Sequence, residues 1–275
     1  MTIGNLLLGL LAETFIHPGS GQNEGVIDLP VAREAATDYP FIAGSSFKGA
    51  LLDRARQQNL DDATRNDVFG ERDSGGNLLV SDVRLLLLPV RSLTGSYKWA
   101  TCPHLLERFN RDFRRALGRS GRYNSDPDRK QYLGVGEGGA ALYLEERTFK
   151  CGGPASPELI QTLSGLVANE ETQQRLGKQL VILNDSDFAW FARYGLAVQA
   201  RNVLDEEKKT SKNLWYEETL PPDTLMYALL SERRTGAVES VKSLFDERPY
   251  LQVGGNETVG QGWFAVKCLE SEVLK

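Results

Sequence analysis

The sequence is poor in the residue types that build thiol, disulfide and histidine-based metal sites, with three cysteines and two histidines among 275 residues. Cys102, Cys151 and Cys268 are odd in number and far apart, so they match neither a zinc-binding spacing nor a disulfide framework. Two histidines are too few for a histidine-rich metal centre. These counts indicate a protein of a reducing cytoplasm.

Long apolar runs are also missing, because no stretch reaches the roughly eighteen consecutive apolar residues that a membrane-spanning helix needs. The apolar start of the chain, residues 1–12, lacks the basic leading region and the cleavage site of a secretory signal. The formal net charge of −5 argues mildly against a nucleic-acid partner, since affinity for phosphate backbones comes largely from Lys and Arg. A groove needs only a local positive patch, however. Composition therefore predicts a cytoplasmic globular protein with no membrane partner.

Apolar periodicity indicates an α+β fold. The first part of the chain reads as strand, helix and strand, at 5–16, 46–58 and 77–88. The C-terminal part repeats this order, with a strand at 224–230, a helix at 237–245 and strands at 250–253 and 263–269. Two such units predict a ferredoxin-like core of the RNA-recognition-motif type, whose open sheet face suits extended RNA.

The two halves are separated by about 130 residues, too many for a plain loop. We therefore predict a single domain over 1–275, with its core at approximately 1–88 and 223–275 and an inserted region at approximately 89–222. The insertion is expected to contain a helix at 103–117, a second helix beginning at Ser156-Pro157-Glu158, and a short strand near Ile182. Residues 190–222 read as a long β-hairpin around the polar tip DEEKKTSKN.

The segment 17–30 leaves the first strand with three glycines and two prolines in fourteen residues, so it is expected to be a loop. Such a loop can present Asp28 as a catalytic group. The alternative is that Asp28 stabilises its own turn through a hydrogen bond from its side chain to the backbone.

The start of the helix at 46–58 is a candidate phosphate site. Serine at 45 and 46 is a favourable helix cap, and free N–H groups at a helix N-terminus attract anions. Lys48 and Arg56 flank the apolar stripe of this helix and could line an RNA groove with it. The alternative is an ordinary cap beside a solvated lysine.

Two further segments are candidates for RNA contact. The helix at 103–117 places Arg108, Arg111, Arg115 and the following Arg119 on one face, which suits phosphates or a neighbouring subunit unless it is merely solvated. The loop between the last two strands is glycine-rich and would let backbone amides approach phosphates, although a plain glycine-rich hairpin fits equally well. Its candidate residues are Gly254, Gly255, Gly260, Gln261 and Gly262.

The remaining candidates are acidic. Glu217 and Glu218 close the long hairpin and could assist acid–base or metal chemistry, but an exposed acidic pair is the default interpretation. His104, beside Pro103 and Cys102, is expected to be structural rather than catalytic. The chain has no serine–histidine–aspartate signature, zinc spacing or dinucleotide fingerprint.

Four segments together resemble the RAMP superfamily of CRISPR antiviral proteins. They are HPGSGQNEGVIDLPVARE (17–34), PFIAGSSFKG (40–49), LWYEETLPPDTLMY (214–227) and GGNETVGQGWF (254–264). Within that superfamily the chain looks like the fourth, backbone subunit of the type III-B, or Cmr, effector complex. The resemblance implies a ferredoxin-like core with a helical insertion and a thumb-like hairpin at 190–222. It also implies copies stacked along one CRISPR guide RNA, with target RNA cut beside each thumb.

The same resemblance places Asp28 at the cleavage position of the family and His17 at a nearby loop histidine. The expected reaction is attack by a 2′-hydroxyl on the adjacent phosphate, with Asp28 as general base or as ligand of a divalent Mg or Mn ion. Expected partners are guide RNA, single-stranded target RNA, other type III-B subunits and copies of the chain itself. Three alternatives stay open: a non-catalytic scaffold, a ribonuclease that processes CRISPR RNA, and the equivalent type III-A subunit.

Overall fold

The computed structural model describes residues 4–21, 26–119, 121, 126–136, 140–205, 207–208 and 210–270. Four antiparallel strands form the centre of its large sheet in the order β16–β1–β14–β6, and a helix follows the first and third strands along the chain. This is the strand order of a ferredoxin-like fold, as predicted. The elements are β1 (Asn5–Ala12), α1 (Gly44–Gln57), β6 (Val83–Arg91), β14 (Leu225–Glu232), α7 (Ala237–Lys242) and β16 (Trp263–Glu270).

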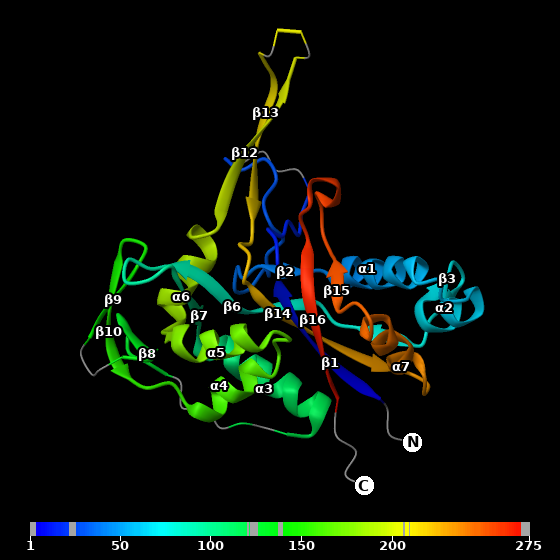
Figure 1. Ribbon diagram of the computed structural model, residues 1–275, viewed down its shortest axis with the longest axis horizontal. Coiled ribbons are helices and arrows are strands. Elements are labelled where there is room, and N and C mark those ends of the chain that lie inside the picture. Colours follow the sequence, from blue (N-terminus) through cyan, green and yellow to red (C-terminus); the bar gives the residue numbers. More distant parts are fainter. Residues whose placement is uncertain are drawn as a thin grey trace.

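The inserted region extends this same sheet (Figure 1). Beyond β6 the sheet continues through five strands: β7 (Tyr97–Thr101), β11 (Leu180–Leu183), β8 (Gln131–Gly134), β10 (Arg147–Gly153) and β9 (Ala141–Leu144). At the opposite edge lies β15 (Tyr250–Gln252), while β2 (Phe41–Ile42) pairs with β6 and β5 (Leu78–Val80) pairs with β14. The strand predicted at 77–88 is therefore two strands, β5 and β6.

Helices cover both faces of the central strands, so the predicted open sheet face is wrong. One face packs on α1 and α7, and the other packs on α3 (Pro103–Leu117), α4 (Pro157–Ser164) and α5 (Glu170–Gln179). The sequence of β1 is apolar at nearly every position, as expected for a strand buried on both faces. At Gly9 a Cβ atom would lie 2.1 Å from the carbonyl oxygen of Leu166, so glycine permits direct packing of backbone on the strand.

The helix expected at 103–117 is confirmed with the same bounds as α3. The predicted cap of α4 is also confirmed, because Ser156 Oγ accepts a hydrogen bond from the Leu159 N–H. Sequence reasoning missed four helical elements: α2 (Asp62–Phe69), α5, α6 (Asp185–Tyr194) and the short 3-10 turn η2 (Glu257–Val259). It also missed the strands β2, β3 (Gly70–Glu71), β4 (Ser74–Gly75), β7, β8, β9 and β10. The helix predicted at 237–245 is α7 followed by the 3-10 turn η1 (Ser243–Phe245). None of the described helices is long and apolar enough to span a membrane.

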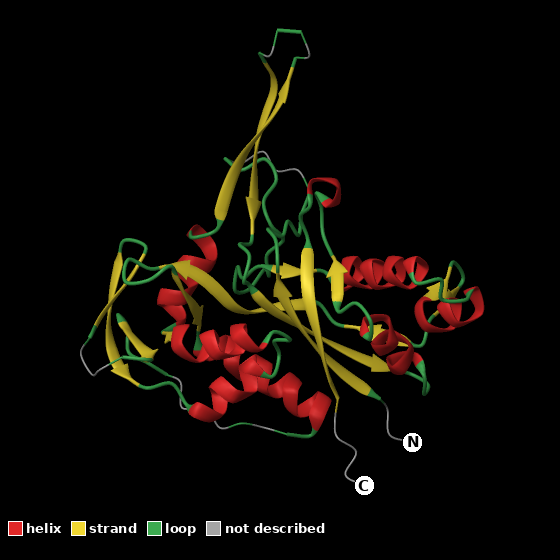
Figure 2. Cartoon of the chain, in the orientation of Figure 1, coloured by secondary structure: helices red, strands yellow, loops and turns green. Residues whose placement is uncertain are grey.

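The long hairpin is confirmed as β12 (Ala197–Leu204) and β13 (Ser211–Thr219), although residues 190–194 belong to α6. The hairpin projects from the body as a single arm, and its tip is the point farthest from the sheet (Figure 2). Its base lies close to the loop that follows β1 and to the glycine-rich loop before β16 (Figure 1). Three segments far apart in the sequence thus meet at the foot of the arm.

Candidate functional site

The loop that carries Asp28 is attached to the foot of the hairpin as a short third strand. The Leu29 N–H donates to the Tyr216 carbonyl oxygen at 3.1 Å, and the Glu218 N–H donates to the Leu29 carbonyl oxygen at 3.0 Å. Asp28 Oδ2 accepts a hydrogen bond from the Tyr216 N–H at 2.8 Å. The side chain of Asp28 is exposed, so its second oxygen faces solvent beside β13. One carboxylate oxygen of Asp28 is therefore bound to the backbone of β13, and the other faces solvent.

His17 binds the same strand two residues further along. Its Nδ1 lies 2.8 Å from the carbonyl oxygen of Glu218, and because a carbonyl can only accept, Nδ1 carries the proton. In the neutral ring Nε2 is then the free acceptor. His17 is only 7% exposed, and it lines a groove with residues of the glycine-rich loop. The structure therefore holds Nδ1 of His17 in a hydrogen bond and leaves Nε2 available to accept a proton.

Glu217 is buried and fully engaged in hydrogen bonds. Its carboxylate accepts from Trp215 Nε1 at 2.8 Å, from Asn256 Nδ2 at 2.8 Å and from Arg201 Nε at 3.2 Å. Burial raises the pKa of Glu217, but the hydrogen bonds from Trp215 and Asn256 and the positive charge of Arg201 outweigh burial and lower it. The carboxylate therefore joins the hairpin to the glycine-rich loop in its charged form.

Glu218 is equally buried and holds the Asp28 loop from the other side. Its carboxylate forms a 2.7 Å ion pair with Arg33 and accepts from the Val31 N–H at 3.1 Å. Both glutamates are only 4% exposed, so the interpretation of an exposed acidic pair is wrong. Arg33 also donates to the carbonyl oxygens of Asp38 and Ala192, which joins the loop to α6.

The glycine-rich loop is fixed to this assembly by Asn256, which sequence reasoning did not single out. Its amide nitrogen donates to Glu217 and to Gln261 Oε1, the latter at 3.0 Å. Asn256 has a positive φ of 64°, a conformation that asparagine tolerates better than most residues. At Gly254 a Cβ atom would lie 2.8 Å from the carbonyl oxygen of His17, so glycine is required there. The available sequence signal was the asparagine that follows two glycines, since asparagine is frequent where the backbone has a positive φ.

A groove of about 540 Å³ separates α1 from the glycine-rich loop. It brings together His17, Ser46, Gly254 and Gly255, whereas Asp28 and the two glutamates lie outside its lining. Among the other predicted RNA contacts, Gln261 is buried behind the loop, whereas Gly260 and Gly262 have positive φ angles of 79° and 87°.

The predicted serine cap of the first helix is wrong. Ala43 is the N-cap residue of α1, and the Gly44 N–H is bound by Asp82 Oδ1 at 2.7 Å. Ser45 and Ser46 are exposed in the first turn and Lys48 is half-buried, while Arg56 pairs with Asp53 at the surface. The helix begins earlier than expected because Asp82 supplies the cap from another part of the chain.

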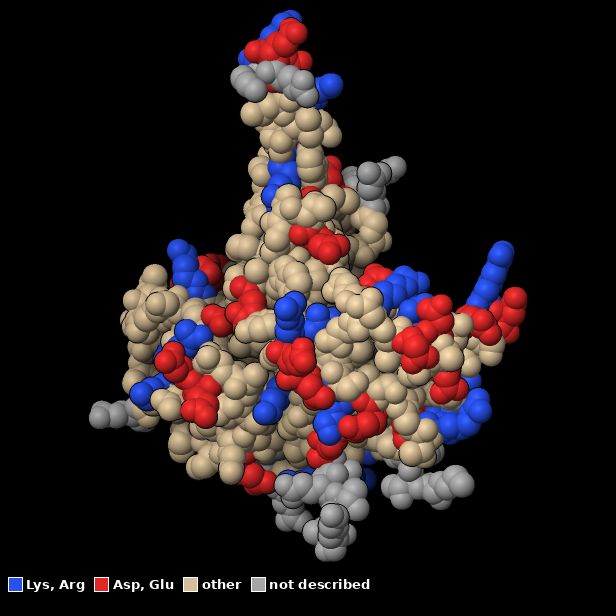
Figure 3. Space-filling view, turned by 45° about the vertical axis from the view of Figure 1, so that its right-hand side comes forward, with Lys and Arg blue, Asp and Glu red and all other residues tan. Residues whose placement is uncertain are grey.

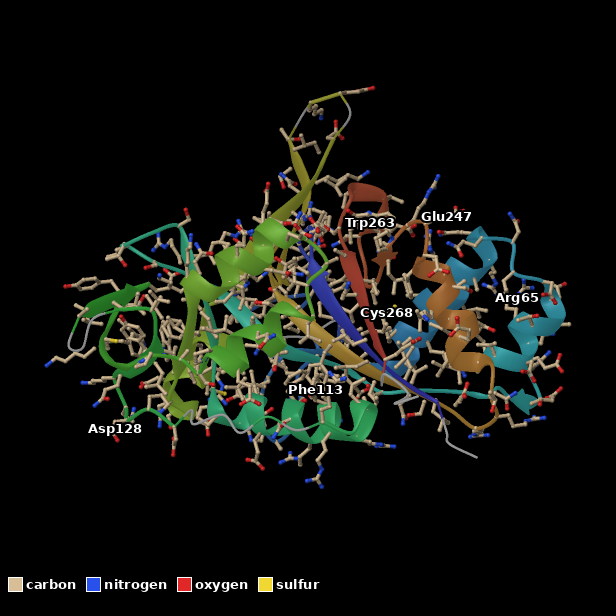
Figure 4. All side chains as sticks on the ribbon, turned by 60° about the horizontal axis from the view of Figure 1, so that its bottom comes forward. Arg65, Phe113, Asp128, Glu247, Trp263 and Cys268 are labelled. Atoms are coloured by element: carbon tan, nitrogen blue, oxygen red, sulfur yellow. The ribbon has the colours of Figure 1, made fainter. Side chains whose placement is uncertain are left out.

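The predicted arginine face lies away from the other candidates. Figure 4 shows α3, marked by Phe113, on the side of the sheet opposite the foot of the hairpin. Arg111 pairs with Glu107 and Arg115 is exposed, whereas Arg108 forms a partly buried 2.7 Å ion pair with Glu34. The structure thus divides the basic candidates between two surfaces. His104 is half-buried beside Tyr39.

Among the described residues, one side chain at the candidate site could ligate a divalent ion. No group of three or more His, Cys, Asp or Glu side chains that could hold a metal occurs within the described ranges. Glu217 and Glu218 are occupied by internal donors, which leaves the exposed oxygen of Asp28. Since Mg²⁺ is commonly held by one or two carboxylates plus substrate phosphates and water, Asp28 fits such a partial site.

Comparison with known proteins identifies the family. The family model described as the RAMP superfamily matches residues 10–265. The chain belongs to the RAMP superfamily. This RAMP protein is 29% identical to the CRISPR system Cmr endoribonuclease Cmr4 of Pyrococcus furiosus, in an alignment that covers 96% of this chain and 95% of that protein.

Solved structures share the fold of this chain over nearly its full length. The crystal structure of oligomeric Cmr4 from Pyrococcus furiosus matches with a TM-score of 0.75 and 25% identity, covering 98% of this chain and 99% of that one. The cryo-EM structure of the type III-B Cmr-beta complex bound to cognate target RNA contains a chain of the same fold. That chain matches with a TM-score of 0.76 and 20% identity, covering 96% of each chain.

Proposed function

We propose that this RAMP protein is a backbone subunit of a type III-B CRISPR effector that binds guide RNA and cuts guide-paired target RNA. Full-length similarity to a protein named Cmr endoribonuclease Cmr4 supports the assignment. The observation that carries the catalytic part is the exposed carboxylate of Asp28, positioned at the foot of a projecting hairpin. The three cysteines are free thiols, which fits a reducing cytoplasm.

The proposed reaction is an RNA transesterification. The 2′-oxygen loses its proton and forms a bond to the adjacent phosphorus, and the bond to the 5′-oxygen breaks. The departing 5′-oxygen takes up a proton from water, so the products carry a 2′,3′-cyclic phosphate and a 5′-hydroxyl. Only RNA has the attacking hydroxyl, so DNA is not cut. The solvent-facing oxygen of Asp28 accepts the proton of the 2′-hydroxyl, while its other oxygen remains bound to the Tyr216 N–H.

His17 is the second group of the chain with proton-transfer capacity at this place. Its Nδ1–H is held by the Glu218 carbonyl, which orients Nε2 and leaves it free to exchange a proton with the RNA. Asp28 and His17 bind β13 at positions two residues apart, about 7 Å along the strand. Glu217 and Glu218 act as positioning residues, because their carboxylates hold the hairpin, the Asp28 loop and the glycine-rich loop together.

A divalent ion, Mg²⁺ or Mn²⁺, would be held by Asp28 together with phosphate oxygens of the bound RNA. When bound, such an ion supplies positive charge that stabilises the negatively charged transition state. The contribution of the chain would be one carboxylate oxygen in a fixed position. Lys48 of α1 remains a candidate for a further phosphate contact.

The hairpin has the surface expected of an arm that separates paired bases. Most of its visible surface is uncharged, and Lys, Arg, Asp and Glu gather near its tip (Figure 3). Val198, Val203, Leu214 and Tyr216 are large apolar or aromatic residues that are 43–53% exposed along its two strands. Displacement of the target strand at the hairpin would permit the near-linear attack that a continuous duplex prevents.

The test is the identity of the product ends. A complex reconstituted with this chain, a defined guide RNA and a matching target should give fragments with a 2′,3′-cyclic phosphate and a 5′-hydroxyl, and none from a target with a 2′-deoxy residue at the cleaved position. Products with a 3′-hydroxyl would exclude attack by the 2′-oxygen.

One observation favours a second candidate function, a scaffold subunit that holds guide RNA without cutting. The hydrogen bond from the Tyr216 N–H gives Asp28 a structural role in fixing its loop. The scaffold function predicts that a variant at Asp28 that keeps this hydrogen bond leaves target cleavage unchanged.

A further inference from the structure

Two large aromatic side chains stand exposed at one corner of the sheet. Trp263 begins β16 and is 39% exposed, and Tyr250 begins the edge strand β15 and is 48% exposed. Tyr250 pairs with Ala265 and Gln252 pairs with Trp263, so alternation puts both aromatic residues on one face of the sheet. Ala265, on the same face, packs against the core under α3, α4 and α5. The helical cover therefore ends before it reaches this corner.

The backbone of Trp263 is held rigidly at this position. Its N–H donates to Thr14 Oγ1 at 3.1 Å, and its carbonyl oxygen accepts from the Glu13 N–H at 2.8 Å. The indole N–H and the Tyr250 hydroxyl have no hydrogen-bond partner, and neither ring stacks on another aromatic ring, in the part of the chain that the structure describes. Tryptophan is rarely left so exposed, and its buried N–H is normally bonded. The backbone of Trp263 is thus fixed by hydrogen bonds, while part of its indole ring stays exposed to solvent.

The two aromatic residues line a cavity of about 260 Å³ together with Arg56 and Gln57 of α1. Figure 4 shows Trp263 at the end of β16 nearest the glycine-rich loop. This cavity is continuous with the groove that contains His17, since four residues line both: Ala50, Asp53, Gln252 and Glu257. Because β15 is the edge strand of the sheet, a ligand extended along α1 from His17 would reach the edge at which Tyr250 and Trp263 are exposed.

We infer that Trp263 and Tyr250 stack on unpaired bases of single-stranded RNA that continues from the groove at His17. The inference rests on the proposed function and extends its RNA path beyond the glycine-rich loop. Every nucleobase has a flat π face, so stacking on fixed aromatic rings binds RNA without selecting its sequence. The corner uses the sheet face on which RNA-recognition motifs carry their stacking aromatics. Arg56 can contribute a phosphate or stacking contact beside them.

The test is RNA binding by the purified full-length chain across a salt series, with a fluorescently labelled oligouridine as probe. Trp263→Ala should weaken binding by about 5- to 150-fold, the range that corresponds to loss of one stacked base. Trp263→Phe should keep most of the affinity, and Tyr250→Ala should weaken binding independently. Tyr143→Ala is the matched control, because Tyr143 is 40% exposed on β9 at the far end of the sheet and should leave binding unchanged.

Stacking and charge are distinguished by the salt dependence. Trp263→Ala should shift the affinity at every salt concentration without changing the slope of log K against log salt, because no phosphate contact is removed. Equal affinity of Trp263→Ala and the wild type would overturn the inference and leave the proposed function intact. A change in the oligomer size of Trp263→Ala without a change in RNA affinity would also overturn it, since the corner would then bind another protein copy. No RNA binding by the wild type would instead contradict the proposed function.

Discussion

Asn256 gives the sharpest test of how the foot of the hairpin is held together. It has a single amide nitrogen that donates to both Glu217 and Gln261, and Glu217 is 4% exposed. Asn256→Gly removes both hydrogen bonds but adopts the positive φ of 64° without strain. Loss of a hydrogen bond to a buried charged group costs about 1.5–3 kcal/mol, so we expect the free energy of unfolding to fall by about that amount.

The matched control is Asn59→Gly. Asn59 also has a positive φ, 56°, but it is exposed and its side chain makes no hydrogen bond within the described segments. Urea denaturation at pH 7 measures both variants, and the difference between them isolates the side-chain hydrogen bonds from the effect of glycine on the unfolded chain. A difference below about 0.5 kcal/mol would refute the structural role of Asn256, because surface substitutions lie within that range.

The same network predicts a pH dependence. The folded pKa of Glu217 lies below its ordinary value of 4.5, so its contribution to stability is present above pH 4.5 and is lost as the pH falls through the lower folded pKa. Asn256→Gly removes one of the donors that lower this pKa. The gap in stability between the variant and the wild type should therefore shrink as the pH falls below 4.5, and a constant gap would contradict the assignment.

Two other predictions concern stability. Arg33→Ala leaves the buried Glu218 carboxylate without its ion-pair partner. The free energy of unfolding, measured by urea denaturation, should fall by about 3–5 kcal/mol. A fall below about 1 kcal/mol would show that the ion pair contributes little to stability. Gly9→Ala should prevent folding, because its Cβ would collide with the Leu166 carbonyl oxygen. Gly49→Ala in α1 meets open space and should raise the free energy of unfolding by up to about 1 kcal/mol. Thermal unfolding should show no cooperative transition for Gly9→Ala and a higher midpoint for Gly49→Ala than for the wild type.

The architecture of the core could be predicted because its signals are local. The order of strands and helices in each half follows from apolar periodicity, and α3 and the Ser156 cap follow from proline and serine at a helix start. The sheet face was assigned wrongly although a local signal existed. The runs in β1 and β6 are apolar at successive positions, which indicates strands buried on both faces. Elements such as α2 were missed because they are short and carry few apolar residues.

The arrangement of the site depends on contacts between distant segments, which no local pattern reveals. Asp28 and His17 could be selected as candidates, but their attachment to β13 joins residues about 190–200 positions apart. The burial of Glu217 and Glu218 was likewise unpredictable, because their partners Asn256 and Arg33 come from other loops. Sequence can therefore select the acidic residues of this site, whereas only the structure distinguishes an exposed carboxylate from two buried ones.

The central claim is that Asp28 takes part in RNA cleavage, and Asp28→Asn in a reconstituted complex tests it most directly. The asparagine side-chain oxygen can still accept the hydrogen bond from the Tyr216 N–H, so the loop should keep its position while the charge is removed. We predict that gel filtration shows normal assembly and that target cleavage falls by at least about 100-fold, as for loss of a general base. Cleavage at the wild-type rate in a normally assembled complex would contradict the account and identify this chain as a scaffold.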